Sequence, residues 1–363
     1  MSFRAVGGDR PLRLVQVGAG GMGRAWLRTI AADPDVELVG LVDLDLDAAR
    51  AALDDARLSG VEIGRNTAEV ARATAADAVV NVTVPEAHLV VNTEALDAGL
   101  PVLCEKPAAP TVATAMVQAA IAEASGELLM ISQSRRYFPA LHALRREVKG
   151  LGAIGTVRTD FFKAPHFGGF RERMPHVLLV DMAIHAFDAA RFLIDAEPVS
   201  VYCEEFNPEW SWYEGAANAA AVFEFDGGIR YVYNGSWCAP GLETSWNGSW
   251  RVSAAHGSAE WDGDGPPVVH RPEAGGAVPV PLETGAQEIA GSLAAFVAAL
   301  RTGRRPDGAA SENLRSLAMV QAAVQSAETG QRVRIDDVIE KARQEALEAT
   351  DRDDVRSALR ARG

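Results

Sequence analysis

Short apolar runs alternate with helix-like segments along the first third of the chain, and this alternation limits the possible folds more than any other feature. Strand-like runs are predicted at Leu12–Val17, Val36–Val42, Ala78–Val84, Pro101–Cys104 and Glu127–Ser132. Helix-like segments are predicted between them at Met22–Ala32, Ala48–Leu58, His88–Ala98 and Val112–Ala124. Strands buried on both faces read as continuous apolar runs, and the intervening helices make parallel crossovers. The pattern predicts a doubly wound α/β domain built on a parallel sheet.

The pattern changes after about residue 134. Helices are expected at Leu141–Val148, Asp181–Ile194, Ala286–Arg301 and Glu312–Thr329. Strand-like runs are expected at Thr156–Lys163, Val199–Glu205, Ala219–Phe225, Ile229–Asn234 and Trp250–Ala254. Turn signals such as Asp226-Gly227-Gly228 separate these runs, which indicates an antiparallel meander in an α+β domain. We therefore expect domains at 1–134 and 135–335, followed by a charged helical tail at 336–363.

A glycine-rich loop follows the first strand and opens the first helix. Its sequence is Gly18-Ala19-Gly20-Gly21-Met22-Gly23, which fits the GxGxxG pattern of dinucleotide-binding Rossmann domains. The N-terminus of the helix offers free N–H groups and the positive end of its dipole to a pyrophosphate. Asp43 ends the second strand about 20 positions after Gly23, where a ribose-binding carboxylate is expected. A carboxylate there repels the 2′-phosphate of NADP, so we expect NAD, with NADP disfavoured.

Charge and cysteine content exclude several classes of partner. The formal net charge is −14, from 35 basic and 49 acidic residues, whereas nucleic acid and anionic membranes need a basic face. Cys104, Cys203 and Cys238 form no CxxC pair, and no His, Asp or Glu cluster has metal-ligand spacing. The polar segment Met1–Pro11 lacks the apolar core of a signal peptide. We expect a soluble cytoplasmic protein without a metal, a nucleic-acid partner or a membrane span.

Further motifs resemble the Gfo/Idh/MocA oxidoreductases, a family that includes glucose-fructose oxidoreductase and inositol dehydrogenases. They are Thr83-Val84-Pro85 with His88, Cys104-Glu105-Lys106-Pro107, Arg135-Arg136-Tyr137, Asp181-Met182-Ala183-Ile184-His185 with Asp188, and Ser326-Ala327-Glu328-Thr329-Gly330. The resemblance implies a Rossmann domain and a second domain with a large, mostly antiparallel open sheet. In the family the exposed face of that sheet commonly packs against another subunit, which implies a homodimer or homotetramer. It also implies a catalytic site between the domains, over the nicotinamide.

The resemblance assigns roles to individual residues. Lys106 matches the catalytic lysine, whose bond to the following proline is often cis, and it would stabilise the reacting oxygen. His185 would accept the hydroxyl proton, and Asp181, one helical turn earlier, would orient the imidazole or hold a neighbouring hydroxyl. Many relatives have glycine where Ala183 stands, so their substrate range transfers poorly. The expected cofactor contacts are Gly18, Gly20, Gly21, Met22, Gly23, Asp43, Thr83, Pro85, His88, Glu105 and Lys106.

These residues predict an NAD-dependent dehydrogenase acting on a secondary hydroxyl of a sugar, sugar glycoside or cyclitol, in either direction. Two alternatives stay open: a relative that retains NAD and cleaves glycosides through transient oxidation, and a non-catalytic NAD- and sugar-sensing protein. Five of the seven tryptophans fall between residues 210 and 250, where indole faces suit either sugar rings or a subunit interface. That stretch lacks a basic cluster, so a neutral substrate is expected. Further candidate substrate contacts are Arg135, Tyr137, His166, His176 and Trp237.

Overall fold

The computed structural model describes residues 3–361; residues 1, 2, 362 and 363, at the ends of the expected domains, lie outside the described part. Two compact units make up the chain, and neither is continuous in sequence. Residues 1–134, 286–314 and 341–363 form the first unit, and residues 135–285 and 315–340 form the second. Each unit is described by itself.

The first unit is built on a parallel sheet. Among the described residues it has six strands in the order β3-β2-β1-β4-β5-β6. Their bounds are β1 Leu12–Val17, β2 Val36–Val42, β3 Glu62–Gly64, β4 Ala78–Asn81, β5 Val102–Glu105 and β6 Leu129–Ser132. Every pairing in this sheet is parallel. This strand order is that of a dinucleotide-binding Rossmann domain, which confirms the expected fold class.

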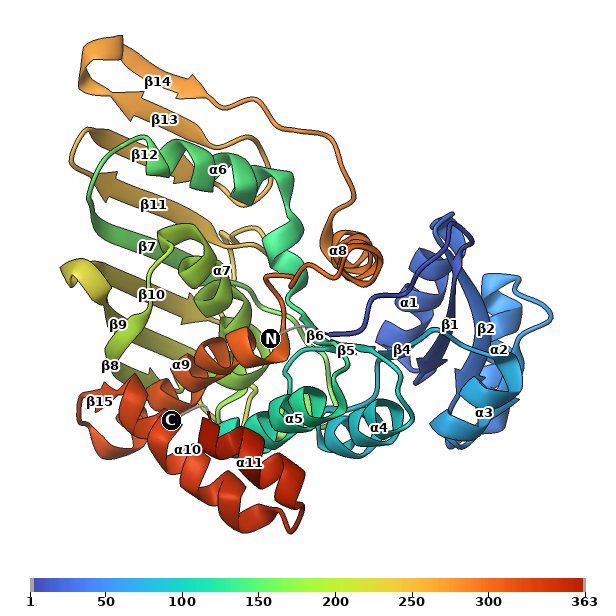
Figure 1. Ribbon diagram of the computed structural model, residues 1–363. Helices are drawn as coiled ribbons and strands as arrows, with labels where there is room; N and C mark the ends of the chain where they lie inside the picture. Colours follow the sequence, from blue (N-terminus) through green and yellow to red (C-terminus); the bar gives the residue numbers. More distant parts are fainter. Residues whose placement is uncertain (1–2, 362–363) are drawn as a thin grey trace. The chain divides into compact units, whose positions relative to one another are not determined.

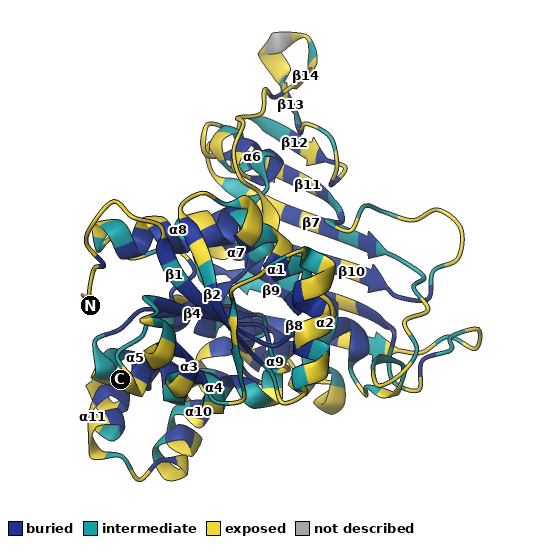
Figure 2. Cartoon of the chain, turned by 90° about the vertical axis from the view of Figure 1, so that its right-hand side faces the viewer, coloured by how far each residue is buried: buried dark blue, intermediate teal, exposed yellow. Residues whose placement is uncertain are grey.

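Helices connect these strands: α1 Gly21–Ala32, α2 Leu46–Ala56, α3 Thr67–Thr74, α4 Pro85–Asp97 and α5 Val112–Ser125. Two helices from later in the chain complete the unit, since α8 (Glu288–Thr302) packs against α1 and α11 (Asp353–Ala361) packs against α5. The central strands β1 and β4 are almost wholly buried, as their dark blue colour in Figure 2 shows. Burial on both faces explains why these strands are mostly apolar in sequence.

The sequence analysis missed β3 and α3. β3 has only three residues, none of them fully buried, so it leaves no apolar run to detect. α3 has eight residues and is recognisable mainly by its cap, because the side chain of Asn66 accepts a hydrogen bond from the N–H of Glu69. That capping pattern is visible in the sequence and was overlooked.

The second unit is built on a large mixed sheet, drawn at the left of Figure 1. Its nine described strands follow the order β14-β13-β12-β11-β7-β10-β9-β8-β15. Their bounds are β7 Ile154–Phe162, β8 Pro198–Phe206, β9 Asn218–Phe225, β10 Arg230–Ser236, β11 Ser249–Ala254, β12 Gly257–Trp261, β13 Val268–Arg271, β14 Gly276–Pro279 and β15 Val333–Arg334. Only β7 and β10, among these strands, pair in parallel. The mostly antiparallel second sheet expected from the resemblance is confirmed.

Helices cover one face of this sheet. α6 (Pro139–Lys149) packs on α7 (Ile184–Ile194) and on β12, while α7 packs on β7. Side chains alternate accordingly along β10, where Tyr231 and Tyr233 are buried and Arg230 and Asn234 are exposed. The other face carries cross-strand ion pairs, including Arg251–Glu260 and Arg230–Glu224.

Two long helices follow α8. α9 spans Ala310–Thr329 and α10 spans Ile335–Ala349, and each has residues in both units. None of the helices in the described part of the chain is long and apolar enough to cross a membrane.

Candidate cofactor and active site

The glycine-rich loop between β1 and α1 contains two positions that have no room for a side chain. At Gly18, φ is +104°, and a Cβ would lie 2.7 Å from the carbonyl oxygen of Val82. At Gly23, a Cβ would lie 2.3 Å from the carbonyl oxygen of Gly18, so only glycine lets the helix start this close to the strand. Contacts within the protein therefore require glycine at both positions.

Gln16 holds this turn from inside, and the sequence analysis missed it. Its side-chain amide is fully buried and donates to the carbonyl oxygens of Gly18 at 2.8 Å and Gly23 at 2.9 Å. One amide thereby ties both ends of the loop together. A glutamine inside an otherwise apolar strand was the available signal.

Asp43 lies beside the same loop. Its Oδ2 accepts the backbone N–H of Ala19 at 2.8 Å, and its Oδ1 accepts the backbone N–H of Asp45 at 2.9 Å. Each carboxylate oxygen retains a further lone pair for a ribose hydroxyl. Asp45 caps α2, and the start of that helix borders an open groove lined by Leu44, Asp45, Leu46, Asp47, Arg50 and Arg65.

The space around the loop fits a dinucleotide. A Cβ built on Gly20 has no neighbour within 4 Å among the described atoms, so this loop edge is open where Gly18 and Gly23 are closed. Gly20, Gly21 and Met22 are exposed, and α1 has no acidic residue in its first turn. The first N–H groups of α1 thus face open space with a positive dipole end, which suits a pyrophosphate.

Lys106 follows β5 on a loop whose base is buried. Glu105 accepts the indole N–H of Trp26 at 2.7 Å and the backbone N–H of Lys106 at 3.0 Å. Burial raises the pKa of the Glu105 carboxyl above its ordinary value, against the lowering effects of Trp26 and Lys106. Lys106 itself is half-buried, and its peptide bond to Pro107 is cis, as the resemblance implies.

His88 is an internal support of this region. Its imidazole is fully buried, with Nδ1 2.9 Å from the carbonyl oxygen of Pro107 and Nε2 3.1 Å from that of Thr83. Burial lowers the pKa of His88 below its ordinary value. The ring therefore links the loop after Lys106 to the loop after β4, where Thr83 and the first residue of α4, Pro85, lie.

A chain of buried amides reinforces the same two loops. Asn81 donates to Asn92 at 2.8 Å, Asn92 to Gln118 at 2.6 Å, and Gln118 to the carbonyl oxygen of Ala108 at 2.9 Å. Asn81 also accepts the Thr83 hydroxyl at 2.7 Å. Asn92 and Gln118 were not singled out in the sequence, because single amides inside predicted helices carry no evident signal. Asn81 was missed although, like Gln16, it is an amide inside a predicted strand.

In the second unit, Asp181 and His185 flank a change of helical geometry. Residues Leu178–Ala183 form a π-helix, and α7 continues from it. The expected α-helix beginning at Asp181 is therefore wrong in its first turn, since local π-helix has no distinct sequence pattern. π-helical turns are frequent at functional sites. Asp181 accepts the Nε–H of Arg171 at 2.8 Å.

His185 lies at a small pocket of about 20 Å³ formed entirely by the second unit. The partly exposed residues around it, here called the mouth, are Arg135, His185, Ala186, Trp246 and Asn247. The buried residues beneath them, here called the floor, include Thr159, Phe161, Tyr233 and Trp250. Arg135 donates to the side chain of Asn247, so the guanidinium is held at the mouth.

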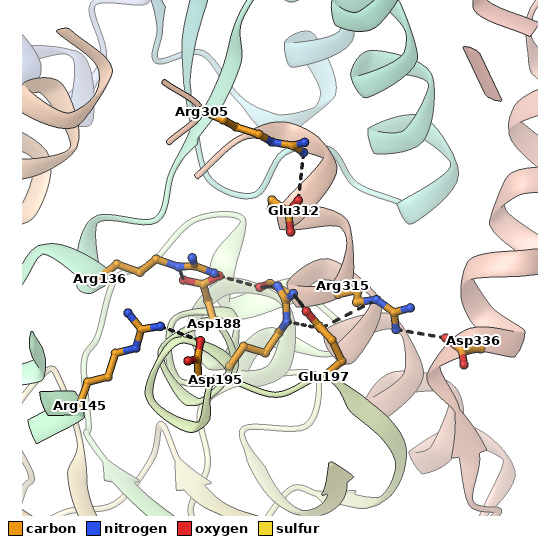
Figure 3. A network of polar contacts seen from close by, with 11 residues as sticks. Arg136, Arg145, Asp188, Asp195, Glu197, Arg305, Glu312, Arg315 and Asp336 are labelled. Carbon is orange, nitrogen blue, oxygen red and sulfur yellow. Dashed lines mark hydrogen bonds and ion pairs between the residues drawn. The ribbon is translucent and has the colours of Figure 1, made fainter. Parts of the chain in front are cut away.

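Asp188 has a structural environment. It is 1% exposed and accepts two hydrogen bonds from Arg136, at 2.6 and 2.8 Å, and one from Ser316 at 2.6 Å. Ser316 in turn accepts a hydrogen bond from Arg191 at 2.9 Å, and Arg191 pairs with Glu197 at 2.8 Å. Figure 3 shows Arg136, Asp188 and Glu197 in this network. Asp188, the third polar residue on this helix after Asp181 and His185, thus anchors α7 within its unit.

The remaining candidates lie in other surroundings. Tyr137 is half-buried at the end of a short 3₁₀ turn. His166 stacks on Trp212 with ring centres 3.7 Å apart, and Trp237 is 2% exposed and stacks with Tyr213. His176 lies 2.6 Å from Glu205. None of these four residues lines the pocket at His185, where Trp246 and Trp250 are the tryptophans of the 210–250 stretch.

Within residues 3–361, no group of three or more His, Cys, Asp or Glu side chains is arranged to hold a metal ion.

Comparison with protein-family models gives matches to two successive parts of the chain. Residues 12–133 match an oxidoreductase family with an NAD-binding Rossmann fold, and residues 146–260 match the GFO/IDH/MocA C-terminal domain. The Rossmann match carries the cofactor class with it, in agreement with the loop geometry described above.

Full-length relatives extend these matches. A protein of Sinorhizobium fredii, y4oX, is 30% identical over 91% of this chain and 98% of its own. The D-apiose dehydrogenase of Paraburkholderia graminis is 28% identical over 88% of each chain. A crystal structure of an Agrobacterium radiobacter oxidoreductase has a TM-score of 0.82 at 17% identity, covering 90% of this chain and 99% of that one, and supports the fold.

Proposed function

Because the chain belongs to the GFO/IDH/MocA family of NAD-binding oxidoreductases, we propose that it oxidises a secondary hydroxyl of a neutral sugar, sugar glycoside or cyclitol, or reduces the corresponding ketone. One observation carries this proposal beyond the family: His185 stands at the mouth of a pocket walled by aromatic rings. Aromatic faces suit the C–H faces of sugars, and imidazole suits proton transfer near neutral pH. The D-apiose dehydrogenase among the relatives supports a sugar substrate.

His185 accepts the hydroxyl proton of the substrate in this proposal. Its ring is partly exposed at the mouth, and its Nδ1 is buried. With Nδ1 buried, the ring presents its other edge to a bound ligand, as a general base requires.

Asp181 holds a neighbouring hydroxyl of the substrate. The Arg171 guanidinium holds one of its carboxylate oxygens, and a carboxylate can accept several hydrogen bonds, including one from a substrate hydroxyl. Its side chain is 20% exposed, so a ligand can reach it.

Lys106 donates to the reacting oxygen and stabilises the negative charge that develops there. Trp26 and the N–H of Lys106 hold Glu105, and His88 holds Pro107, so the residues on both sides of the lysine are fixed. Bound NAD supplies the ring that accepts the hydride. Gly18, Gly20, Gly21, Met22 and Gly23 would hold its pyrophosphate, and Asp43 its adenosine ribose.

The absence of a charge clamp favours a neutral substrate. Arg135 is the one cation among the described residues that line the pocket, and it donates to Asn247. A phosphorylated sugar needs several such donors.

A screen of NAD reduction tests the function. Purified protein is incubated with NAD and free sugars, cyclitols, glycosides, sugar phosphates or nucleotide sugars, and NADH is followed at 340 nm. We expect activity among the neutral members, abolished in the His185→Asn variant. Activity confined to phosphorylated members would refute the neutral class. Release of an aglycone without net NADH would favour the glycoside-cleaving alternative, and binding without turnover a sensor.

The uncovered face of the nine-stranded sheet is the proposed subunit interface of a homodimer or homotetramer, and the cytoplasm is the proposed compartment. Ion pairs on that face, such as Arg158–Asp160 within β7 at 3.0 Å and the cross-strand pair Arg251–Glu260, place charges of opposite sign side by side. Light scattering of the purified chain measures the oligomeric state directly.

A further inference from the structure

The floor of the pocket at His185 contains a polar group that the proposed chemistry does not use. Tyr233 is 1% exposed, and its hydroxyl is buried without a hydrogen-bond partner among the described residues. A buried hydroxyl left unsatisfied costs stability, so such groups are rare and call for an explanation. Tyr233 also lines the pocket.

The neighbouring tyrosine on the same strand shows that this is a property of the position. Tyr231 is equally buried, yet its hydroxyl donates to Thr159 Oγ1 at 3.2 Å. Both rings pack edge-on to Phe187, with centres 6.3 Å away for Tyr231 and 5.3 Å for Tyr233. The two tyrosines thus share a strand face and a packing partner, and differ in whether a protein group satisfies the hydroxyl.

Gly235 leaves the room that the Tyr233 hydroxyl occupies. A Cβ at Gly235 would lie 2.5 Å from that hydroxyl oxygen, so any other residue would displace it. Burial raises the pKa of Tyr233 well above its ordinary value, so the phenol stays neutral and can both donate and accept.

The size and lining of the pocket define what can reach this hydroxyl. A volume of about 20 Å³ accommodates one small substituent and excludes a ring. Phe161, Trp246 and Trp250 give the approach apolar walls. The cation at the mouth, Arg135, is held by Asn247, and the described floor residues include none. The occupant is therefore small and uncharged, with an apolar stem and a terminal hydroxyl.

We propose that this pocket is a specificity subsite for a hydroxymethyl group of the substrate, whose oxygen hydrogen-bonds to Tyr233. The proposal rests on the proposed function, since His185 at the mouth places the reacting carbon. A hydroxyl attached directly to the ring stays at the mouth, whereas one carried on an extra carbon reaches the buried floor. The methylene packs on the aromatic walls, and the hydroxyl satisfies the phenol.

The test compares Tyr233→Phe with the matched control Tyr231→Phe. Both variants keep the ring, and Tyr231→Phe removes a hydroxyl that lies outside the pocket lining. The probes are D-glucose with 6-deoxy-D-glucose and D-galactose with 6-deoxy-D-galactose, each with saturating NAD. For the wild type and for Tyr231→Phe we expect kcat/KM to be about tenfold to a hundredfold higher for the member that carries the hydroxymethyl oxygen.

In Tyr233→Phe, the kcat/KM values of the two members of each sugar pair are expected to differ by less than about threefold. The kcat/KM of the 6-deoxy sugar should be unchanged or higher, which separates lost recognition from a damaged fold. An unchanged ratio in Tyr233→Phe would overturn the subsite and assign the hydroxyl to a structural water. Oxidation of cyclitols alone would also overturn it, while leaving the proposed function in place. If no polyol reduces NAD in the wild type, the proposed function itself fails.

Discussion

Asp43 is hydrogen-bonded to Ala19 of the phosphate loop, with 2.8 Å between its Oδ2 and the backbone nitrogen. The bond fixes the carboxylate at the end of β2, beside the glycine-rich loop. In the proposed function, the carboxylate that would bind the ribose is thus held by the backbone of the loop that would bind the phosphates.

Cofactor preference should follow from this charge. NAD is expected to exceed NADP in kcat/KM by about 30- to 150-fold, which corresponds to about 2–3 kcal/mol. Asp43→Asn should narrow the ratio at least about tenfold, because Arg50 and Arg65 of the adjacent groove remain to attract a 2′-phosphate. Asp45→Asn is the control, since asparagine still caps α2. Equal efficiency of the wild type with both cofactors would disprove the assignment.

Lys106→Ala should separate chemistry from cofactor binding. Loss of the donor to the reacting oxygen is expected to lower kcat by about 10²–10³. The Kd for NADH, measured by fluorescence titration, should change by less than about threefold, because the proposal assigns the pyrophosphate to the glycine loop and not to Lys106. Lys341→Ala, at an exposed position of α10, serves as the control. Near-normal turnover in Lys106→Ala would exclude the catalytic role.

The pH profile should identify His185 as the base. In His185→Asn, kcat is expected to fall by about 10²–10⁴, and the acidic limb of the kcat/KM profile, which reports ionisation of the base, should disappear. The control is His270→Asn, because His270 is exposed on β13. If the acidic limb persists in His185→Asn, another group is the base.

Asp188 should matter for stability and not for the chemical step. Asp188→Ala leaves the buried guanidinium of Arg136 without its carboxylate, which is expected to cost about 3–5 kcal/mol in the free energy of unfolding. Asp195→Ala breaks ion pairs with Arg145 and Lys149 near the surface and should cost less than about 1 kcal/mol. Urea denaturation measures both values. A stable Asp188→Ala protein with abolished turnover would instead make Asp188 part of the active site.

His88 should make stability fall in mild acid. Burial lowers its pKa in the folded protein, while in the unfolded chain the pKa is about 6.5. As the pH falls through that value, the unfolded chain takes up a proton that the folded protein does not. Stability is therefore complete above about pH 6.5 and declines toward the lower folded pKa, by at most about 1.4 kcal/mol per pH unit for one proton.

The comparison is between denaturation of the wild type and of His88→Asn from pH 5 to pH 8. The variant should have the shallower pH dependence, and His270→Asn should match the wild type. Identical slopes in wild type and His88→Asn would show that the imidazole does not carry this linkage.

Much of the first unit could be predicted from the sequence because its strands are buried on both faces. β1 and β2 have the expected bounds, since short and mostly apolar runs such as Leu12–Val17 and Val36–Val42, separated by a helix-like segment, have few other interpretations. β12, β13 and β14 of the second sheet were missed. They are short strands at one side of the sheet with mixed burial, and they carry no regular alternation.

The candidate site likewise has one part that the sequence could indicate and another that it could not. Gly18, Gly23 and Asp43 follow a fixed local spacing, so the sequence can indicate them. The pocket depends on contacts between distant segments: Tyr233 on β10, Trp246 before β11 and His185 on α7 share it only after the sheet has formed. Likewise the partners of Asp188 are 52 and 128 residues away, so its burial could not be inferred from the helical pattern alone.

The packing of α11 on α5 has a consequence for the order of events during synthesis. Arg352, just before α11, pairs with Asp97 at a separation of 255 residues, and Val355 and Leu359 are buried in the same unit. A nascent chain that has emerged as far as Ser132 holds all six strands of the first sheet but lacks α8 and α11. During synthesis of the second unit, the side of α5 that later contacts α11 is therefore uncovered. Chaperones can bind the exposed surface in this interval, and it can also cause aggregation.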